Sequence, residues 1–235
     1  MLTLEQKTYI NSFIKDIYVI NLPHRTDRLA ANFNQVAKIS DNPLSSKIID
    51  GIRFTDLHYL SGRAGCSAAM CKSLTVAYEN NLDNFLLLED DAYFIDERLL
   101  AIYNACKDLS KINWDICYLG ARIKSPMTDF SPGLYRIHNW GCNHAVLYNR
   151  KCIKYLIDLL PKWDAGYNIW MDWIMKNECF DTWQPKILGQ NADFYCFHTK
   201  ELVSLQLANF SDLNQKHSDG IKILEDDFER NRPQR

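Results

Sequence analysis

The stretch that decides the fold is Leu86-Leu87-Leu88-Glu89-Asp90-Asp91. Its leucines continue an apolar run that is typical of a buried strand, and three acids end the run abruptly. Because packed leucines fix the strand, we expect the acids at its carboxyl end, the edge where open α/β sheets bind ligands. Adjacent carboxylates repel one another unless a cation or hydrogen-bond donors compensate them. The stretch therefore indicates a cation site or, as the plainer alternative, a solvated acidic turn.

The composition suits one globular domain around such a strand. The chain has 235 residues, of which 47% are hydrophobic, and a formal net charge of −2. This balance argues against a nucleic-acid binder, which normally presents a basic face. No segment resembles a signal peptide or a membrane-spanning helix, and the eight cysteines lack zinc-binding spacing. We therefore expect a soluble, cytoplasmic protein with free thiols.

Strands and helices alternate along the sequence. The expected strands are 16–22, 47–51, 85–88, 115–120, 142–147 and an extended segment 182–188, and the expected helices are 25–38, 66–80, 98–109, 150–160 and 168–177. This alternation predicts an α/β fold with a mostly parallel sheet covered by helices on both faces. Residues 122–139 are expected to form a long loop or hairpin. We expect one domain over 1–219 and a charged tail over 220–235 that forms a solvated helix.

Polar residues follow the first predicted strand. Asn21 can exchange hydrogen bonds with a base or ribose, and Arg25 and Arg28 offer planar donor forks to phosphate oxygens. The alternative is an ordinary helix start in which Arg28 pairs with Asp27 or another surface acid. The second predicted strand ends at Asp50, which could accept a ribose hydroxyl or only cap its own turn.

Gly65 and Cys66 stand at the expected start of the next helix. Free backbone amides there could face an anion, or the glycine could allow the helix to pack tightly against the sheet. Together with the acids, these features outline a site for a nucleotide with a metal-bridged diphosphate. The sequence has no P-loop and no G-x-G-x-x-G fingerprint, which argues against a P-loop ATPase or a Rossmann dehydrogenase.

In the order and spacing of these pieces, the chain resembles glycosyltransferase family 25, which contains lipooligosaccharide and collagen hydroxylysine galactosyltransferases. The matching pieces are Val19-Ile20-Asn21-Leu22 with Arg25 and Arg28, Ile49-Asp50-Gly51, Gly65-Cys66, Leu87-Leu88-Glu89-Asp90-Asp91, Gly141 with His144-Ala145, Asp172-Trp173, and Pro185 through Gln190. The resemblance covers about residues 20 to 190. It departs at Arg63, where the family usually has Glu, and at Ala69 and Met70, where it has a Ser-His pair. A changed substrate or a loss of activity would follow from these departures.

The resemblance implies a GT-A type fold and an inverting transfer of galactose or glucose from a UDP-sugar to a hydroxyl on a glycan, such as lipopolysaccharide, or on a protein. In related enzymes the last acid contacts the ion, so Asp91, with Glu89, is the expected ligand of Mn²⁺ or Mg²⁺. The donor-binding residues implied by the resemblance are Asn21, Arg25, Arg28, Asp50, Glu89, Asp90 and His144. For His144 the alternative is a core histidine.

The expected general base is Asp172, which the resemblance places across from the donor. Trp170 and Trp173 flank it and would form an apolar wall for the sugar. The alternative is an amphipathic helix whose tryptophans pack the core. Two other functions remain open: a sugar nucleotidyltransferase, although residues 21–25 lack the glycine-rich loop it needs, and a non-catalytic nucleotide- or glycan-binding module.

Overall fold

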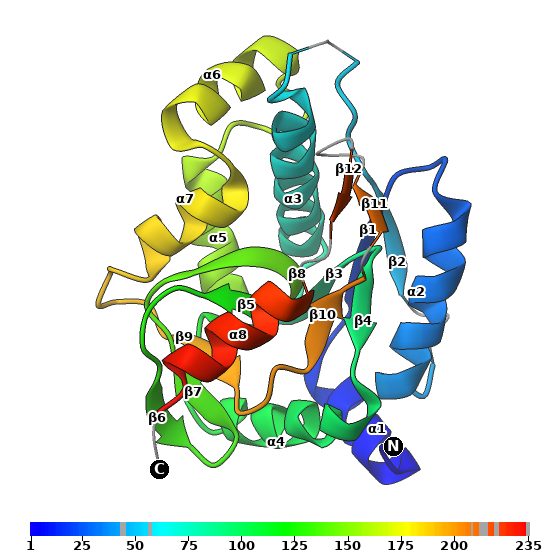
Figure 1. Ribbon diagram of the computed structural model, residues 1–235, viewed down its shortest axis with the longest axis vertical. Helices are drawn as coiled ribbons and strands as arrows, with labels where there is room; N and C mark the ends of the chain where they lie inside the picture. The colour runs from blue at the N-terminus through cyan, green and yellow to red at the C-terminus, as the bar shows by residue number, and fades with distance from the viewer. Residues whose placement is uncertain (43–45, 56–57, 208, 212–215, 219–220, 234–235) are drawn as a thin grey trace.

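The computed structural model describes residues 1–42, 46–55, 58–207, 209–211, 216–218 and 221–233. Its centre is a sheet of eight strands in the order β2-β1-β3-β8-β5-β9-β7-β6 (Figure 1). The strands are β1 Ile17–Asn21, β2 Lys47–Asp50, β3 Asn84–Glu89, β5 Ile116–Ile123, β6 Thr128–Ser131, β7 Leu134–Arg136, β8 Trp140–Asn149 and β9 Cys196–Thr199. Two small sheets pair β4 Ala92–Phe94 with β10 Ser204–Gln206, and β11 Asn209–Ser211 with β12 Lys216–Ser218.

Strand direction in the central sheet follows a simple pattern. β2, β1 and β3 are parallel, as are β5 and β9, whereas β8 runs antiparallel to both β3 and β5. β7 is antiparallel to β9 and to β6. Six strands of this sheet therefore run one way, and β8 and β7 run the other way. The predicted α/β class with a mostly parallel central sheet is confirmed.

Helices cover both faces of this sheet (Figure 1). α1 Leu4–Phe13, α2 Thr26–Ile39 and α4 Leu100–Leu109 contribute to one core, and α3 Ser61–Glu79, α5 Arg150–Leu159, α6 Tyr167–Asn177 and α7 Phe180–Leu188 contribute to the other. Successive leucines of β3 alternate between these cores, because side chains of a strand point to opposite faces in turn. Leu86 and Leu88 enter the first core and Leu87 enters the second, and all three are fully buried. The strand that carries the acids is therefore held from both sides.

The third helix begins earlier than predicted. α3 starts at Ser61, so Gly65 lies inside the helix rather than before it. A Cβ atom at Gly65 would lie 2.1 Å from the carbonyl oxygen of Ile52, a contact that only glycine allows. Gly65 therefore allows tight packing, as one alternative predicts, although against the segment after β2 rather than the sheet itself. The alternative of an anion site at Gly65 and Cys66 is wrong, because neither residue stands at a helix end.

The prediction that 182–188 is extended is wrong, because this segment belongs to α7. Pro185 lies inside the helix and lacks the N–H that would bond the carbonyl of Asp181. Burial of one helix face compensates for this lost bond, since Phe180, Trp183 and Leu188 all pack into the core. The spacing of these three residues in the sequence is helical, and this periodicity is the signal that could have predicted the helix.

The segment 122–139 contains the β6–β7 hairpin, as one of the two expected alternatives had it. The charged segment after residue 220 contains the expected helix, α8 Ile221–Asn231, but the helix is not merely solvated. Leu224 and Phe228 are buried at 2% and 1% exposure, and α8 packs on β5 (Figure 1). Asp227 Oδ2 accepts a hydrogen bond from Arg122 Nε at 2.6 Å. The second Leu-Glu-Asp-Asp stretch, residues 224–227, has a structural role, because its first and last residues attach α8 to the sheet.

All eight cysteines are free thiols, and five of them are buried, namely Cys71, Cys106, Cys117, Cys152 and Cys196.

Within the described ranges, no helix combines the length and the apolar character that crossing a bilayer requires.

Candidate functional site

A cavity of about 580 Å³ opens at the sheet edge where β3 ends. Leu22, directly after β1, Glu89 at the end of β3, and Arg122 near the end of β5 line it. Gly141 lines it from the start of β8, because an antiparallel strand begins where its neighbours end. We call this cavity the edge pocket.

A bulge between β5 and β8 lies beside the edge pocket. The register between β5 and β8 shifts on both sides of Gly120, and Cys142 has a left-handed backbone with φ of 66°. A bulge breaks the regular alternation of side chains and re-aims those that follow it. Arg122 and Cys142, which lie beside the bulge on the two strands, both line the pocket.

The three acids all line the edge pocket, and Arg28 on α2 compensates two of them. Arg28 Nη1 lies 2.9 Å from Asp90 Oδ1 and 3.6 Å from Asp91 Oδ2. Gln206 Nε2 donates a hydrogen bond to Glu89 Oε2 at 3.0 Å. The acids therefore do not form a solvated turn, because protein donors hold them inside a pocket wall.

Compensation of this cluster is incomplete. Burial, and then repulsion from Asp91, raises the pKa of Glu89 well above its usual range and that of Asp90 to about 6. Burial also raises the pKa of Asp91, although Arg28 opposes the rise. Asp91 Oδ1 is buried and has no hydrogen-bond partner in the described structure. The cluster is therefore poised to accept further positive charge.

Glu89 and Asp91 together suit a hard cation that shares its coordination with a ligand. In the part of the chain that the structure describes, no three His, Cys, Asp or Glu side chains are placed to hold a metal ion by themselves. Mg²⁺ and similar ions are commonly held by one or two carboxylates plus substrate phosphates. The unpartnered Oδ1 of Asp91 fits this arrangement.

Basic side chains also line the edge pocket. Arg53, Arg63 and Lys124 line it, and their side chains make no ion pair or hydrogen bond with another described residue. Gly141 leaves room for one of them, since a Cβ atom there would lie 2.9 Å from Lys124 Nζ. Lys124 and Arg63 both lower the pKa of Glu178 on the pocket rim, after the larger effect of its partner Lys186. Unpaired cations of this kind suit phosphate oxygens.

The structure brings four of the predicted site residues together, namely Arg28, Glu89, Asp90 and Asp91. Other predicted donor-binding residues do not line the edge pocket. Asn21 is buried, and its Nδ2 donates to the carbonyl of Leu22 at 2.8 Å. Arg25, rather than Arg28, pairs with Asp27, at 3.0 Å. Asp50 is exposed at the end of β2.

His144 lies in the core rather than in the edge pocket. It is fully buried, and its Nε2 lies 3.0 Å from the carbonyl oxygen of Ser204. Burial lowers its pKa to about 4, so the ring is neutral at pH 7. His198 is also fully buried, with a pKa lowered to about 4 by burial. Neither histidine lines the pocket that contains the carboxylates.

Asp172, the predicted general base, is exposed on α6 and does not line the edge pocket. Trp170 and Trp173 are buried, and their rings meet edge to face with centroids 5.5 Å apart. Both tryptophans belong to the core, as the alternative of an amphipathic helix predicts.

Sequence reasoning missed several residues of the pocket. Asp181 in the first turn of α7 lines it, together with Arg53, Arg122 and Lys124. Arg63 was recognised only as a departure from the family pattern. No motif marks these residues, because they reach the pocket through the packing of separate elements.

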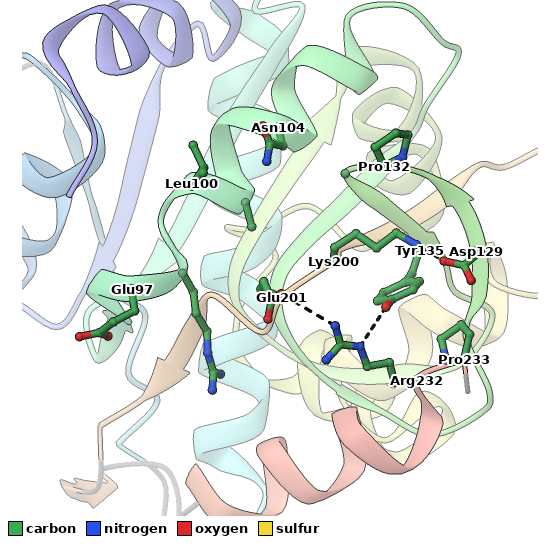
Figure 2. Close-up of a pocket in the computed structure, with 13 residues that line it drawn as sticks. Glu97, Leu100, Asn104, Asp129, Pro132, Tyr135, Lys200, Glu201, Arg232 and Pro233 are labelled. Carbon is green, nitrogen blue, oxygen red and sulfur yellow. Dashed lines mark hydrogen bonds and ion pairs between the residues drawn. The ribbon is translucent and has the colours of Figure 1, made fainter. Parts of the chain in front are cut away.

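A second cavity of about 670 Å³ lies among α4, β7 and the segment after β9 (Figure 2). It shares no lining residue with the edge pocket. Several of its charged groups pair with one another: Lys200 pairs with Asp129, and Arg232 lies 3.8 Å from Glu201 and 3.0 Å from the hydroxyl of Tyr135 (Figure 2). We therefore place the candidate site in the edge pocket, although it is the smaller cavity.

No protein-family model matches the sequence, and no curated protein is significantly similar to it. One similar solved structure is a glycosyltransferase involved in the glycosylation of the major capsid of PBCV-1, with a TM-score of 0.39 and 11% identity over 68% of this chain and 74% of that chain. Another is a mannose-1-phosphate geranyltransferase from Thermus thermophilus, with a TM-score of 0.37 and 10% identity over 67% of each chain. A third is a putative glucose-1-phosphate thymidylyltransferase from Bacillus anthracis, with a TM-score of 0.35 and 11% identity over 74% of this chain and 70% of that chain. At TM-scores below 0.5, these similarities carry no further conclusion about this chain.

Proposed function

We propose that this protein is a glycosyltransferase of GT-A type, related to family 25, that moves a hexose from a UDP-sugar to a hydroxyl group of a glycan or protein. The observation that carries the proposal is the edge pocket at the carboxyl end of β3, which is lined both by incompletely compensated carboxylates and by unpaired cations. A nucleotide sugar has a diphosphate that would bind both kinds of group, either directly or through a cation.

Different residues of the edge pocket would bind different parts of such a donor. Glu89 and Asp91 would hold Mn²⁺ or Mg²⁺, which as a Lewis acid would supply stabilisation for the charge of a leaving diphosphate. Arg63 and Lys124 offer further positive charge to the phosphate oxygens. Arg28 keeps Asp90 and Asp91 in place through its two contacts.

Ala69 and Met70 give the pocket a wall that differs from the family pattern. Both residues line the edge pocket and are otherwise buried. Where the family has a polar Ser-His pair, this chain therefore offers an apolar surface. We infer that this wall changes the choice of sugar rather than the binding of the diphosphate, because the carboxylates and cations of the pocket are retained.

Isothermal calorimetry with UDP, with and without Mn²⁺, tests the proposal. We expect UDP to bind more tightly with Mn²⁺, and Asp91→Asn to remove this dependence because it removes a charged oxygen ligand. Asp226→Asn is the matched control, since Asp226 belongs to the second Leu-Glu-Asp-Asp stretch and is exposed on α8. Mn²⁺-dependent affinity that survives in Asp91→Asn would contradict the assignment of the metal ligand.

Product analysis tests the reaction. We expect UDP release when the protein is incubated with UDP-galactose or UDP-glucose, Mn²⁺ and a panel of glycan acceptors. Release of pyrophosphate from UTP and a hexose 1-phosphate would instead identify a sugar nucleotidyltransferase. UDP binding without either product would identify a non-catalytic module.

A further inference from the structure

The edge pocket contains five carboxylates, and four of them have other roles. Asp90 and Asp91 contact Arg28, and Glu89 accepts a hydrogen bond from Gln206. Glu178 is exposed and pairs with Lys186 at 2.9 Å. Asp181 is the remaining carboxylate, and among the described residues it has no basic partner within ion-pair distance.

Several contacts fix Asp181 at the pocket. It lies in the first turn of α7, whose start is anchored by the burial of Phe180 and Trp183. The backbone N–H of Phe180 donates to Ser67 Oγ at 3.1 Å, which ties α7 to α3. The thiol of Cys179 donates to Asp181 Oδ1 and orients the carboxylate.

Asp181 lines the same pocket as the acidic end of β3 and acts electrostatically on groups there. Its negative charge helps to raise the pKa of Glu89, after burial and Asp91, and that of Cys142, after burial. Glu89 ends β3 and Cys142 lies near the start of the neighbouring strand β8, so Asp181 acts on the ends of two paired strands. The pocket also contains no histidine side chain in its described lining, which leaves its carboxylates as the candidates for a general base.

We propose that Asp181 is the general base of the transfer reaction; this inference rests on the proposed function. The Asp181 carboxylate takes the proton from the acceptor hydroxyl while its oxygen forms a bond to the anomeric carbon of the sugar. The bond between that carbon and the diphosphate breaks, and its electron pair leaves on the diphosphate oxygen. The products are the inverted glycoside, UDP and protonated Asp181, which then returns its proton to water.

This assignment replaces Asp172 by a residue that the chain brings to the reacting groups. Asp172 lies on the solvent side of α6, opposite the buried Trp170 and Trp173. A general base must lie within hydrogen-bond reach of the proton that it removes. Among the two candidates, Asp181 alone lines the pocket.

UDP release from UDP-galactose and from UDP-glucose, with Mn²⁺ and with water as the acceptor, tests the inference. We expect Asp181→Asn to lower kcat by about 10²-fold or more, as the loss of a general base does. Its UDP affinity by calorimetry should stay unchanged, because the diphosphate contacts remain. Asp172→Asn should keep the full rate, and Asp181→Glu should recover part of it. Circular dichroism and thermal unfolding confirm that the variants fold.

The outcomes separate the two proposals. A normal rate in Asp181→Asn, or a large loss in Asp172→Asn, overturns the assignment of Asp181 and leaves the glycosyltransferase proposal standing. UDP binding by the wild-type protein without any UDP release, with water or with the panel of glycan acceptors, identifies a non-catalytic module and overturns the proposed function together with this inference. A wild-type protein that binds no UDP overturns the proposed function and this inference with it.

Discussion

Asp90 shows that burying the acidic cluster in the pocket wall lowers the stability of the fold. Its side chain is 11% exposed and lies 2.9 Å from Arg28, yet its pKa is raised from 3.8 to about 6 because burial and Asp91 outweigh the arginine. The native protein therefore binds a proton at Asp90 at pH values where the unfolded chain has lost it. Such a group stabilises the fold less as the pH rises.

We predict that Asp90→Asn becomes more stable, relative to the wild type, as the pH rises from 4 to 7. The native pKa of about 6 exceeds the unfolded value of 3.8, so the wild type loses free energy of unfolding across this window and the amide does not. The gain is on the order of 2–3 kcal/mol from the size of the shift. Urea denaturation of both proteins at several pH values measures it.

Comparing two proteins is necessary because buried histidines act in the opposite direction. His144 and His198 have native pKa values of about 4, below the usual 6.5, so they add stability as the pH rises through this same window. Both histidines are present in the wild type and in Asp90→Asn, and their contribution cancels in the difference. A difference that stays constant between pH 4 and 7 would contradict the prediction.

At the scale of elements, α8 serves as the cover of β5 rather than as a detached tail. Phe228 packs its ring against His198, with centroids 5.0 Å apart, and against Tyr135 at 6.3 Å. The helix also carries Asp227, which pairs with Arg122 of the edge pocket. One helix thus stabilises the sheet and restrains a pocket residue.

We predict that Phe228→Ala lowers the free energy of unfolding by about 3–5 kcal/mol, as truncation of a buried Phe does. Ile223→Ala is the matched control on the same helix, because Ile223 is 49% exposed. This control should change stability by less than about 0.5 kcal/mol, as exposed sites usually do. Urea denaturation measures the free energy of unfolding of both variants. Equal losses in the two variants would mean that α8 does not dock through Phe228.

At the scale of the whole molecule, the edge pocket joins residues from most of the chain. Arg28 and Asp181 are separated by α3, β3, β5 and β8 in sequence, yet both line one cavity. A ligand that contacts both walls would therefore hold the two ends of the fold together. Its binding free energy would add to the stability of the native state alone.

We predict that UDP with Mn²⁺ raises the unfolding temperature of the protein. At a ligand concentration of 100 times Kd, the gain in stability is about 2.7 kcal/mol. Uridine, which lacks phosphates, should produce no such shift, and Asp91→Asn should respond to UDP in the same way with and without Mn²⁺. Differential scanning calorimetry measures these shifts. An equal shift with uridine would mean that the phosphates make no contact in the pocket.

Sequence alone could predict those features that local signals determine. The leucine run of β3 placed the acids at a sheet edge, and Arg28, Glu89, Asp90 and Asp91 do meet there. The direction of β8, the burial of α8 and the helical state of α7 depend on contacts between distant segments. Asp181 reaches the pocket through such contacts, so no pattern near residue 181 could have revealed it.

The ion pair between Arg122 and Asp227 spans 105 residues of chain. A ribosome makes a polypeptide from its N-terminus onward, so β5 emerges well before the helix that covers it. Until α8 has been synthesised, the surface of β5 that it covers stays exposed in the nascent chain. Exposed surface of this kind invites chaperone binding or aggregation. The ligand-binding edge of this protein is therefore completed late in its biogenesis, after all eight strands of the central sheet have been translated.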